Sequence, residues 1–312
     1  MVLVNLLLFI VAFVSIWLGS GLIVSSVSNF SSKLKLSPFA FSFVFLGLLT
    51  SLPEFSVGLQ AVASHDAEIF VGNLLGGIIV LFLVIIPLLA IFGNGISLKN
   101  DLDSKTTFFT LAVILTPSLF TLDKKVTNLE GGILILLYGI LLFVIERKNG
   151  IFNRENSKIL NISAYSHKDL LKLIVGICVI FISSSIIVDK TVFFADMFNI
   201  SAFYIGLLVI ALGTDLPEMS LAIRSVISGK KDIAMGDYIG AAAASTLMFG
   251  IFTLLHNGEV LTSSAFLTTF IFILTALTLF FIFVKSKNFI TRKQGILMFA
   301  VYIIFIFVEI HG

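Results

Sequence analysis

The sequence predicts an all-α, polytopic membrane protein with ten transmembrane helices arranged as two inverted five-helix repeats. Three observations support this prediction. Of the 312 residues, 58% are hydrophobic and only 12% are charged, whereas a soluble domain is about 25% charged. Ten apolar runs follow one another along the chain, and their loops share the basic residues unequally. A polar string that ends in Pro53 and Glu54 recurs in the second half at Pro217 and Glu218.

This composition excludes several classes of protein. So many apolar residues cannot all be buried in a water-facing fold, which excludes a soluble enzyme and a disordered or collagenous chain. The single cysteine, Cys178, excludes a disulfide scaffold and a multi-cysteine metal site. The basic residues lie in loops between apolar runs, so the net charge of +2 does not indicate nucleic acid binding. No HExxH, GxSxG or phosphate-binding loop is present, and we expect neither enzymatic activity nor a cofactor.

The apolar runs set the predicted spans, because a helix needs about 20 mostly apolar residues to cross a bilayer. The first run has no basic residue before it and no convincing cleavage site, so we interpret it as a retained helix rather than a signal peptide. The predicted spans are 3–28, 38–64, 68–93, 106–121, 129–146, 170–189, 201–228, 232–255, 263–284 and 294–310.

Lysine and arginine residues predict the orientation. When the loops are assigned alternately to two sides, all but three of the 20 Lys and Arg residues fall on one side, the exceptions being Lys124, Lys125 and Lys190. The positive-inside rule makes the richer side cytoplasmic and places both termini outside the cell membrane. The longest loop, 147–169, is basic and polar, and it separates a first half, 1–146, from a second half, 170–312.

An internal repeat relates the two halves. Residues Leu49–Glu54 read LTSLPE and residues Gly213–Glu218 read GTDLPE, and with the same offset of 164 positions Gly76 falls on Gly240. Each half has an odd number of predicted spans, so the second copy would enter the membrane inverted relative to the first. That plan is typical of secondary transporters, whose site lies near the membrane midplane where the repeats meet.

Both strings place oxygen ligands inside an apolar span. Proline frees the carbonyl four residues before it, near Leu49 in the first copy and near Gly213 in the second. A mid-span glutamate costs about 2.5–3.5 kcal/mol on insertion scales, so a matched pair indicates function, whereas either string alone could be a kink with a protonated glutamate. With no Cys or His nearby, we expect a hard cation such as Na⁺, Ca²⁺ or H⁺ rather than zinc or copper. The candidate side-chain ligands are Thr50, Ser51, Glu54, Thr214, Asp215 and Glu218.

The two strings resemble the α-repeat signatures (GTSLPE type) of the cation/Ca²⁺ exchanger superfamily, especially of the prokaryotic Na⁺/Ca²⁺ exchangers. The resemblance covers nearly the whole chain and implies ten spans in inverted five-helix repeats. It also implies that Glu54 and Glu218 are central carboxylates shared by competing Na⁺ and Ca²⁺, with oxygens from Thr50, Thr214 and Ser51. The mechanism it implies is alternating access, in which the first and sixth spans slide over the rest.

The second part of each signature departs from the family pattern, GNxxGSNIxN. The strings here are GNLLGGIIVL from Gly72 and GDYIGAAAAS from Gly236. The GxxxG frame, typical of close helix packing, is present in both. In the family pattern the Ser, the next Asn and the last Asn carry ligands. In this sequence these three positions hold Gly77, Ile78 and Leu81 in the first copy and Ala241, Ala242 and Ser245 in the second. A serine of the first signature, Ser51, is instead Asp215 in the second, three residues before Glu218, where a helix would place both carboxylates on one face.

The sequence therefore predicts a secondary antiporter of small inorganic cations, similar to Na⁺/Ca²⁺ exchangers, in the lipid bilayer. It shows no sign of a nucleic acid or an obligatory protein partner. Crowding of Glu54, Asp215 and Glu218 would also suit a proton-coupled Ca²⁺ or Na⁺ exchanger. A non-transporting membrane scaffold with a degenerate site is the alternative from a different class. Asp237, where the first copy has Asn73, is open as an entrance ligand, a proton-relay residue or a helix-end acid.

Overall fold

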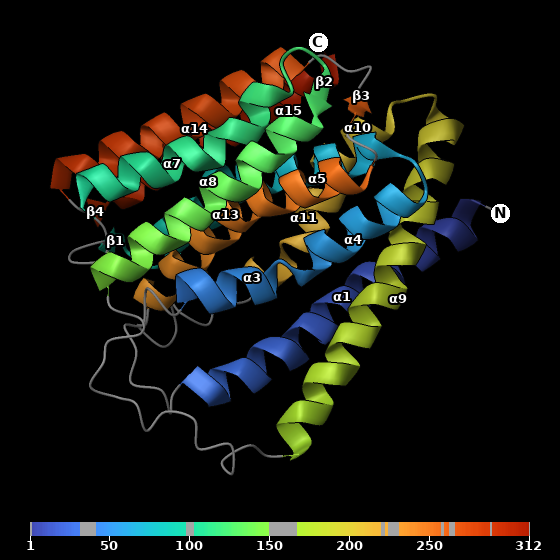
Figure 1. The fold of residues 1–312 in the computed structure, drawn as a ribbon, viewed down its shortest axis with the longest axis horizontal. Helices are drawn as coiled ribbons and strands as arrows, with labels where there is room; N and C mark the ends of the chain where they lie inside the picture. Colours follow the sequence, from blue (N-terminus) through green and yellow to red (C-terminus); the bar gives the residue numbers. More distant parts are fainter. Residues whose placement is uncertain are drawn as a thin grey trace.

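The computed structural model describes residues 2–31, 42–97, 103–149, 167–219, 222–223, 231–256, 259–261, 266–287 and 289–311, which form a helical bundle (Figure 1). The π-helical turns are labelled η. The first half contains α1 (Val2–Ser31), η1 (Ser42–Leu46), α3 (Gly47–Thr50), α4 (Leu52–Ala63), α5 (Ala67–Val80), η2 (Leu81–Ile85), α6 (Ile86–Phe92), α7 (Ser104–Phe120) and α8 (Asn128–Asn149). The second half contains α9 (His167–Phe198), α10 (Ala202–Ile205), η5 (Gly206–Ile210), α11 (Ala211–Thr214), α13 (Lys231–Leu255), α14 (Phe266–Lys287) and α15 (Arg292–His311).

Most of the predicted spans appear as membrane-length helices. In the described part of the chain, seven helical segments are long and apolar enough to cross a membrane, and a bent pair of helices would make an eighth. Predicted spans 106–121 and 294–310 are also helical, as α7 and α15, but α7 has only 17 residues and neither is among the seven. The chain is thus polytopic and helical, while the count of ten stays a prediction. Residues 150–166 of the predicted central loop lie outside the described residues.

Two segments, one from each half, form the core of the bundle. An 18-residue apolar stretch within Ala67–Phe92 is 89% buried and one within Ala234–Leu255 is 78% buried, whereas that of Val2–Gly19 is only 22% buried. Helix α5 packs on α10, η5 and α11, and α13 packs on η1 and α3. Each core helix therefore contacts the segment that precedes the Pro-Glu string of the opposite half. Helices α1 and α9 pack against each other at one edge of the bundle (Figure 1).

Glycine makes these core contacts possible. A Cβ atom added to Gly76 would lie 2.3 Å from the carbonyl oxygen of Leu207, and one added to Gly240 would lie 2.1 Å from that of Phe43. Since a Cβ atom cannot approach a backbone oxygen so closely, a side chain at either position would push the helices apart. The GxxxG strings thus mark close helix packing, as the sequence predicts.

Among the described residues, two short antiparallel sheets join the halves. Strand β1 (Ile96–Ser97) pairs with β4 (Phe289–Ile290), and β2 (Lys125–Thr127) pairs with β3 (Glu259–Leu261). Ile96 lies opposite Ile290, and Val126 lies opposite Val260. The offset of 164 positions takes Ile96 to Val260 and Val126 to Ile290, so each sheet maps onto the other in register. The same offset maps η1 and α3 onto η5 and α11.

Candidate cation site

Both Pro-Glu strings interrupt a helix at the same point. The stretch of η1 and α3 ends at Thr50, and α4 begins at Leu52 with Pro53 in its first turn, bent by 48° from the preceding stretch. In the second copy α11 ends at Thr214, and helical structure resumes at 216–219 after Asp215. Proline suits the first turn of a helix, where its missing N–H would have no partner. Glu54 consequently lies in the first turn of α4, where the helix dipole favours a carboxylate.

The structure brings three of the predicted ligands together. Glu54, Asp215 and Glu218 each offer one carboxylate oxygen to a group whose members lie within 4.8 Å of one another. All three side chains are buried, with at most 4% of their surface exposed. The group combines the first Pro-Glu string with the second, so neither half of the chain contains the site by itself.

These carboxylates lack the partners that buried acids ordinarily have. Both carboxylate oxygens of Glu54 and of Glu218, and Oδ2 of Asp215, form no hydrogen bond within the described residues. A buried, unpaired carboxylate costs several kcal/mol unless a cation or a proton compensates it. Oxygen atoms from three carboxylates within one small volume suit Na⁺ or Ca²⁺, because hard cations prefer oxygen ligands.

Two threonines connect the breaks to the core helices of the opposite half. Thr50 Oγ1 donates a hydrogen bond to Asp237 Oδ1 at 3.0 Å, and Thr214 Oγ1 donates one to Asn73 Oδ1 at 3.1 Å. Thr50 and Thr214 are equivalent by the offset of 164, as are Asn73 and Asp237. All four side chains are fully buried. The hydroxyls predicted as ligands thus lie at two equivalent corners, each shared with a polar side chain of a core helix.

The sequence-based list of candidate ligands did not include Asn73 or Asp237, although it left Asp237 open as an entrance ligand. Both follow a glycine of the GxxxG frame, and this shared position is the signal that could have identified them. Asp237 is fully buried, and its carboxylate accepts a hydrogen bond from Thr50 of the opposite half. Asn73 Nδ2 and Asp237 Oδ2 have no hydrogen-bond partner in the part of the chain that the structure describes.

Three further positions of the two signatures are Ser51, Gly77 and Ala241. Ser51 is buried, and its hydroxyl donates to the carbonyl oxygen of Gly47 in its own helix at 2.7 Å. A Cβ atom added to Gly77 would lie 3.6 Å from Asp215 Oδ2, so the carboxylate of Asp215 borders the space that a side chain at position 77 would enter. The backbone nitrogen of Ala241 lies close to Gly47, 2.7 Å from where a Cβ atom on that glycine would stand. The two copies therefore differ here: Asp215 faces Gly77, whereas the equivalent residues of the other copy are Ser51 and Ala241.

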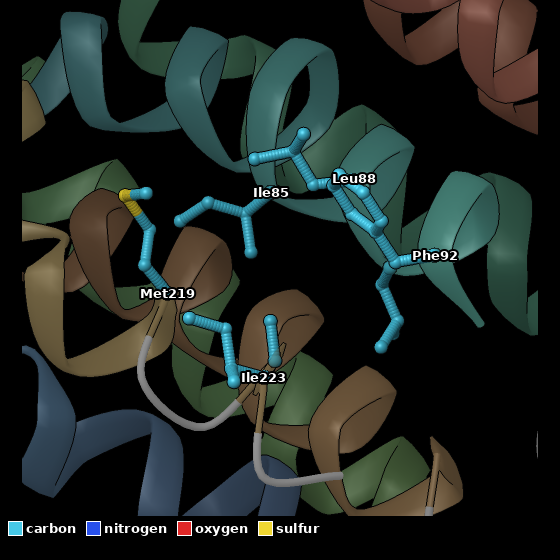
Figure 2. Close-up of a pocket in the computed structure, with 7 residues that line it drawn as sticks. Ile85, Leu88, Phe92, Met219 and Ile223 are labelled. Carbon is cyan, nitrogen blue, oxygen red and sulfur yellow. The ribbon is translucent and has the colours of Figure 1, made fainter. Parts of the chain in front are cut away.

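A separate cavity of about 380 Å³ lies beside Met219, the residue after Glu218. Met219 and Ile223 face Ile85, Leu88 and Phe92 of η2 and α6 across it (Figure 2). The described residues that line it are all apolar, so their side chains offer no oxygen ligand to a cation.

Comparison with known proteins places these features in a family. The model of the family described as "Sodium/calcium exchanger protein" matches residues 4–145 and 168–310. The chain is 24% identical to the "Putative antiporter CaxA" of Alkalimonas amylolytica over 90% of both chains. It is also 24% identical to the "Sodium/calcium exchanger MaX1" of Methanosarcina acetivorans over 99% of both chains. To the "Inner membrane protein YrbG" of Escherichia coli it is 26% identical, over 81% of this chain and 80% of that protein.

Solved structures share the fold. The sodium-calcium exchanger NCX_Mj soaked with 10 mM Na⁺ and no Ca²⁺ has a TM-score of 0.70 at 24% identity, covering 98% of this chain and 99% of that one. The same exchanger soaked with 2.5 mM Na⁺ and 0.1 mM Ca²⁺ has a TM-score of 0.68 at 23% identity, covering 98% of both chains. The likeness extends over nearly the whole of this chain.

Proposed function

Because the chain belongs to the sodium/calcium exchanger protein family, with matches to both halves, we propose that it is a secondary antiporter of small inorganic cations. The observation that carries the proposal is the group formed by Glu54, Asp215 and Glu218: one oxygen of each lies within 4.8 Å of the others, and five of the six carboxylate oxygens have no hydrogen-bond partner among the described residues. A bound cation compensates these charges and takes the oxygens as ligands. Thr50, Ser51 and Thr214 assist as neutral oxygen ligands at the helix breaks.

Ca²⁺ exchanged for Na⁺ is the transport reaction that we propose. Ca²⁺ takes six to eight oxygen ligands, and a site with several carboxylates favours a divalent ion. Relatives named as an antiporter and as a sodium/calcium exchanger support the same assignment. The bound ions are cargo, so the protein needs no resident cofactor.

Proton coupling is the second candidate, and Asp215 is the observation that favours it. Asp215 occupies the position where the first copy has Ser51, and it gives the site an acid beyond the two glutamates. In a Ca²⁺/H⁺ or Na⁺/H⁺ exchanger this carboxylate would carry the proton in exchange for the metal ion. The two candidates differ in which gradient drives uptake.

For the architecture we propose ten spans in two inverted halves, 1–146 and 170–312, joined by the linker 147–169, with both termini outside the cell. The reciprocal contacts between η1, α3 and α13 and between η5, α11 and α5 support this arrangement. The site lies where these segments meet, as expected of alternating access between inverted repeats. In this proposal α1 and α9 are the pair that moves.

The test is cation flux in proteoliposomes of the purified, full-length protein. We expect an imposed Na⁺ gradient to drive Ca²⁺ uptake and expect Glu54→Gln or Glu218→Gln to abolish it, because each removes a charged ligand of the group. Glu309→Gln is the matched control: Glu309 is also buried, but it lies on α15 and accepts a hydrogen bond from Thr269 at 3.3 Å. That variant should transport normally.

Each alternative predicts a different outcome. Uptake driven only by a pH gradient would replace the Na⁺-coupled assignment with the proton-coupled one. Robust flux in the Glu54→Gln, Glu218→Gln double variant would contradict the site itself. A wild-type protein that inserts and folds but moves no cation under either gradient would be a scaffold that has kept only the fold.

A further inference from the structure

Asp237 and Asn73 occupy equivalent positions on the two core helices but differ in charge. Asp237, on α13, accepts its hydrogen bond from Thr50 at 3.0 Å, and Asn73, on α5, accepts its own from Thr214 at 3.1 Å. We call these pairs the Thr50 corner and the Thr214 corner. The same hydrogen bond is therefore made by a carboxylate at one corner and by a neutral amide at the other.

Hydrogen bonding alone does not explain the charge at the Thr50 corner. The Thr214 corner shows that an amide oxygen is a sufficient acceptor at this position. Asp237 is fully buried, and its Oδ2 has no hydrogen-bond partner within the described residues. Burying a carboxylate at membrane depth costs far more than burying an amide. Unless a proton neutralises it, the carboxylate of Asp237 thus requires a compensating cation nearby.

The position of Asp237 indicates where that positive charge lies. Thr50 stands four residues before Glu54, on the other side of the helix break. Tyr238, the next residue on α13, donates a hydrogen bond to the carbonyl oxygen of Glu218 at 3.2 Å. Helix α13 is therefore held against both glutamate-bearing segments. Asp237 contacts Thr50, four residues before Glu54, and does not belong to the 4.8 Å set of Glu54, Asp215 and Glu218.

We propose that Asp237 is a fourth carboxylate of the cation site and that its charge favours divalent over monovalent cations. The inference rests on the proposed function, because it takes the group of Glu54, Asp215 and Glu218 as the ion site. At a given distance a carboxylate attracts a divalent cation twice as strongly as a monovalent one. Removing one charge therefore weakens divalent binding by about the square of the factor by which it weakens monovalent binding.

Asp237→Asn separates this role from a structural one. The substitution conserves shape and keeps an oxygen that can accept from Thr50, as Asn73 accepts from Thr214, while it removes the charge. The measurement is equilibrium binding of ⁴⁵Ca²⁺ to the purified full-length protein, with Na⁺ as competitor. We expect the Ca²⁺ affinity to fall roughly tenfold or more and the Na⁺ affinity to fall by about the square root of that factor. Unchanged affinities, or equal losses for both ions, would overturn the proposal.

The Thr214 corner supplies a matched control. Asn73→Asp combined with Asp237→Asn keeps the number of carboxylates and moves the charge to the equivalent corner. Recovery of Ca²⁺ affinity in this double variant would assign the loss in Asp237→Asn to charge. If the double variant has the same thermal unfolding midpoint as the wild type and still does not recover, the effect is local to position 237 and the selectivity role is wrong.

The outcomes also separate this inference from the proposed function. If the wild type binds neither ⁴⁵Ca²⁺ nor Na⁺, the ion site itself is wrong, and the role of Asp237 fails with it. If the wild type and Glu309→Gln bind Ca²⁺ and Asp237→Asn binds it equally well, only the assignment of Asp237 fails.

Discussion

At the scale of single residues, the buried acids differ in their arrangement. Glu54, Asp215 and Glu218 converge on one another, whereas Glu309 lies outside that group, with one oxygen accepting a hydrogen bond from Thr269 and Oε2 without a partner within the described chain. Convergence is what distinguishes a cation site from isolated buried acids, because a single cation can neutralise several converging charges at once. A transport defect is therefore expected on neutralising a member of the group and not on neutralising Glu309.

Asp66, an acidic residue outside the predicted spans, has a raised pKa. It precedes α5 and is half-buried. Burial and, next, the charge of Glu68 raise the pKa of its carboxyl above the ordinary value. A folded-state pKa above the unfolded one means that ionised Asp66 lowers the stability of the fold above the raised pKa. This loss disappears as the pH falls to the ordinary range of aspartate, about 4.

Asp66→Asn should therefore raise the thermal unfolding midpoint of the detergent-solubilised protein at pH 7.5. The gain should stay below about 1 kcal/mol, because solvent screens a half-buried charge. At pH 4 wild type and variant should unfold at nearly the same temperature. A larger gain at pH 4 than at pH 7.5 would show that the sign of the pKa shift is wrong.

At the scale of helices, two adjacent glycines on α5 illustrate how the site is built. Gly76 lies against the backbone of Leu207, while Gly77 borders the carboxylate of Asp215 at an ordinary contact distance. Gly76 thus determines how closely the two halves approach, and Gly77 determines how much room the site has. Gly240 repeats the role of Gly76 on α13, where it lies against the backbone of Phe43.

Gly76→Ala and Gly240→Ala should each destabilise the fold by about 1–3 kcal/mol, because the added methyl group forces apart helices that touch through their backbones. A lower thermal midpoint and a smaller yield of monodisperse protein are the expected results. Gly77→Ala is the control on the same helix as Gly76 and should leave the midpoint near that of the wild type, because its Cβ would lie at an ordinary contact distance, 3.6 Å, from Asp215 Oδ2. Equal losses in all three variants would contradict the packing argument.

The sequence predicts much of the site because its chemistry is local. The matching Pro-Glu strings identify Glu54 and Glu218, and the three-residue spacing to Asp215 predicts the acid beside them. The helix breaks follow from proline. The partners of Thr50 and Thr214 are not predictable in this way, because each hydroxyl meets a helix from the opposite half. The π-helical turns η1 and η5 leave no mark in the hydropathy pattern either, since they only widen an apolar helix locally.

At the scale of the whole molecule, α1 and α9 form the peripheral pair that the transport proposal requires to move. The pair touches the rest of the bundle at defined points, and one of them is a hydrogen bond between Ser56 of α4 and Ser184 of α9. Motion of α9 relative to α4 must break that contact. A covalent bond at the same place would therefore prevent the motion.

Ser56→Cys combined with Ser184→Cys, in a protein whose native Cys178 is replaced by Ser, should form a disulfide on oxidation. Cation flux in proteoliposomes should then fall by roughly an order of magnitude or more and return on reduction, since closely apposed residues can be cross-linked without moving the backbone. Each single cysteine variant serves as a control that oxidation should not inhibit. Undiminished flux in the fully cross-linked protein would show that α9 does not slide past α4.

The pairing of strands from the first half with strands from the second half has a consequence for biosynthesis. β1 and β2 both precede the central loop, yet their partners β4 and β3 lie more than a hundred residues later in the chain. When the first half leaves the ribosome, neither of its strands has a partner, and α5 still lacks the backbone of Leu207 against which Gly76 packs. Contacts of such long sequence separation form late and slowly. The first half can therefore complete these contacts only after the second half has supplied β3, β4 and the backbone of Leu207.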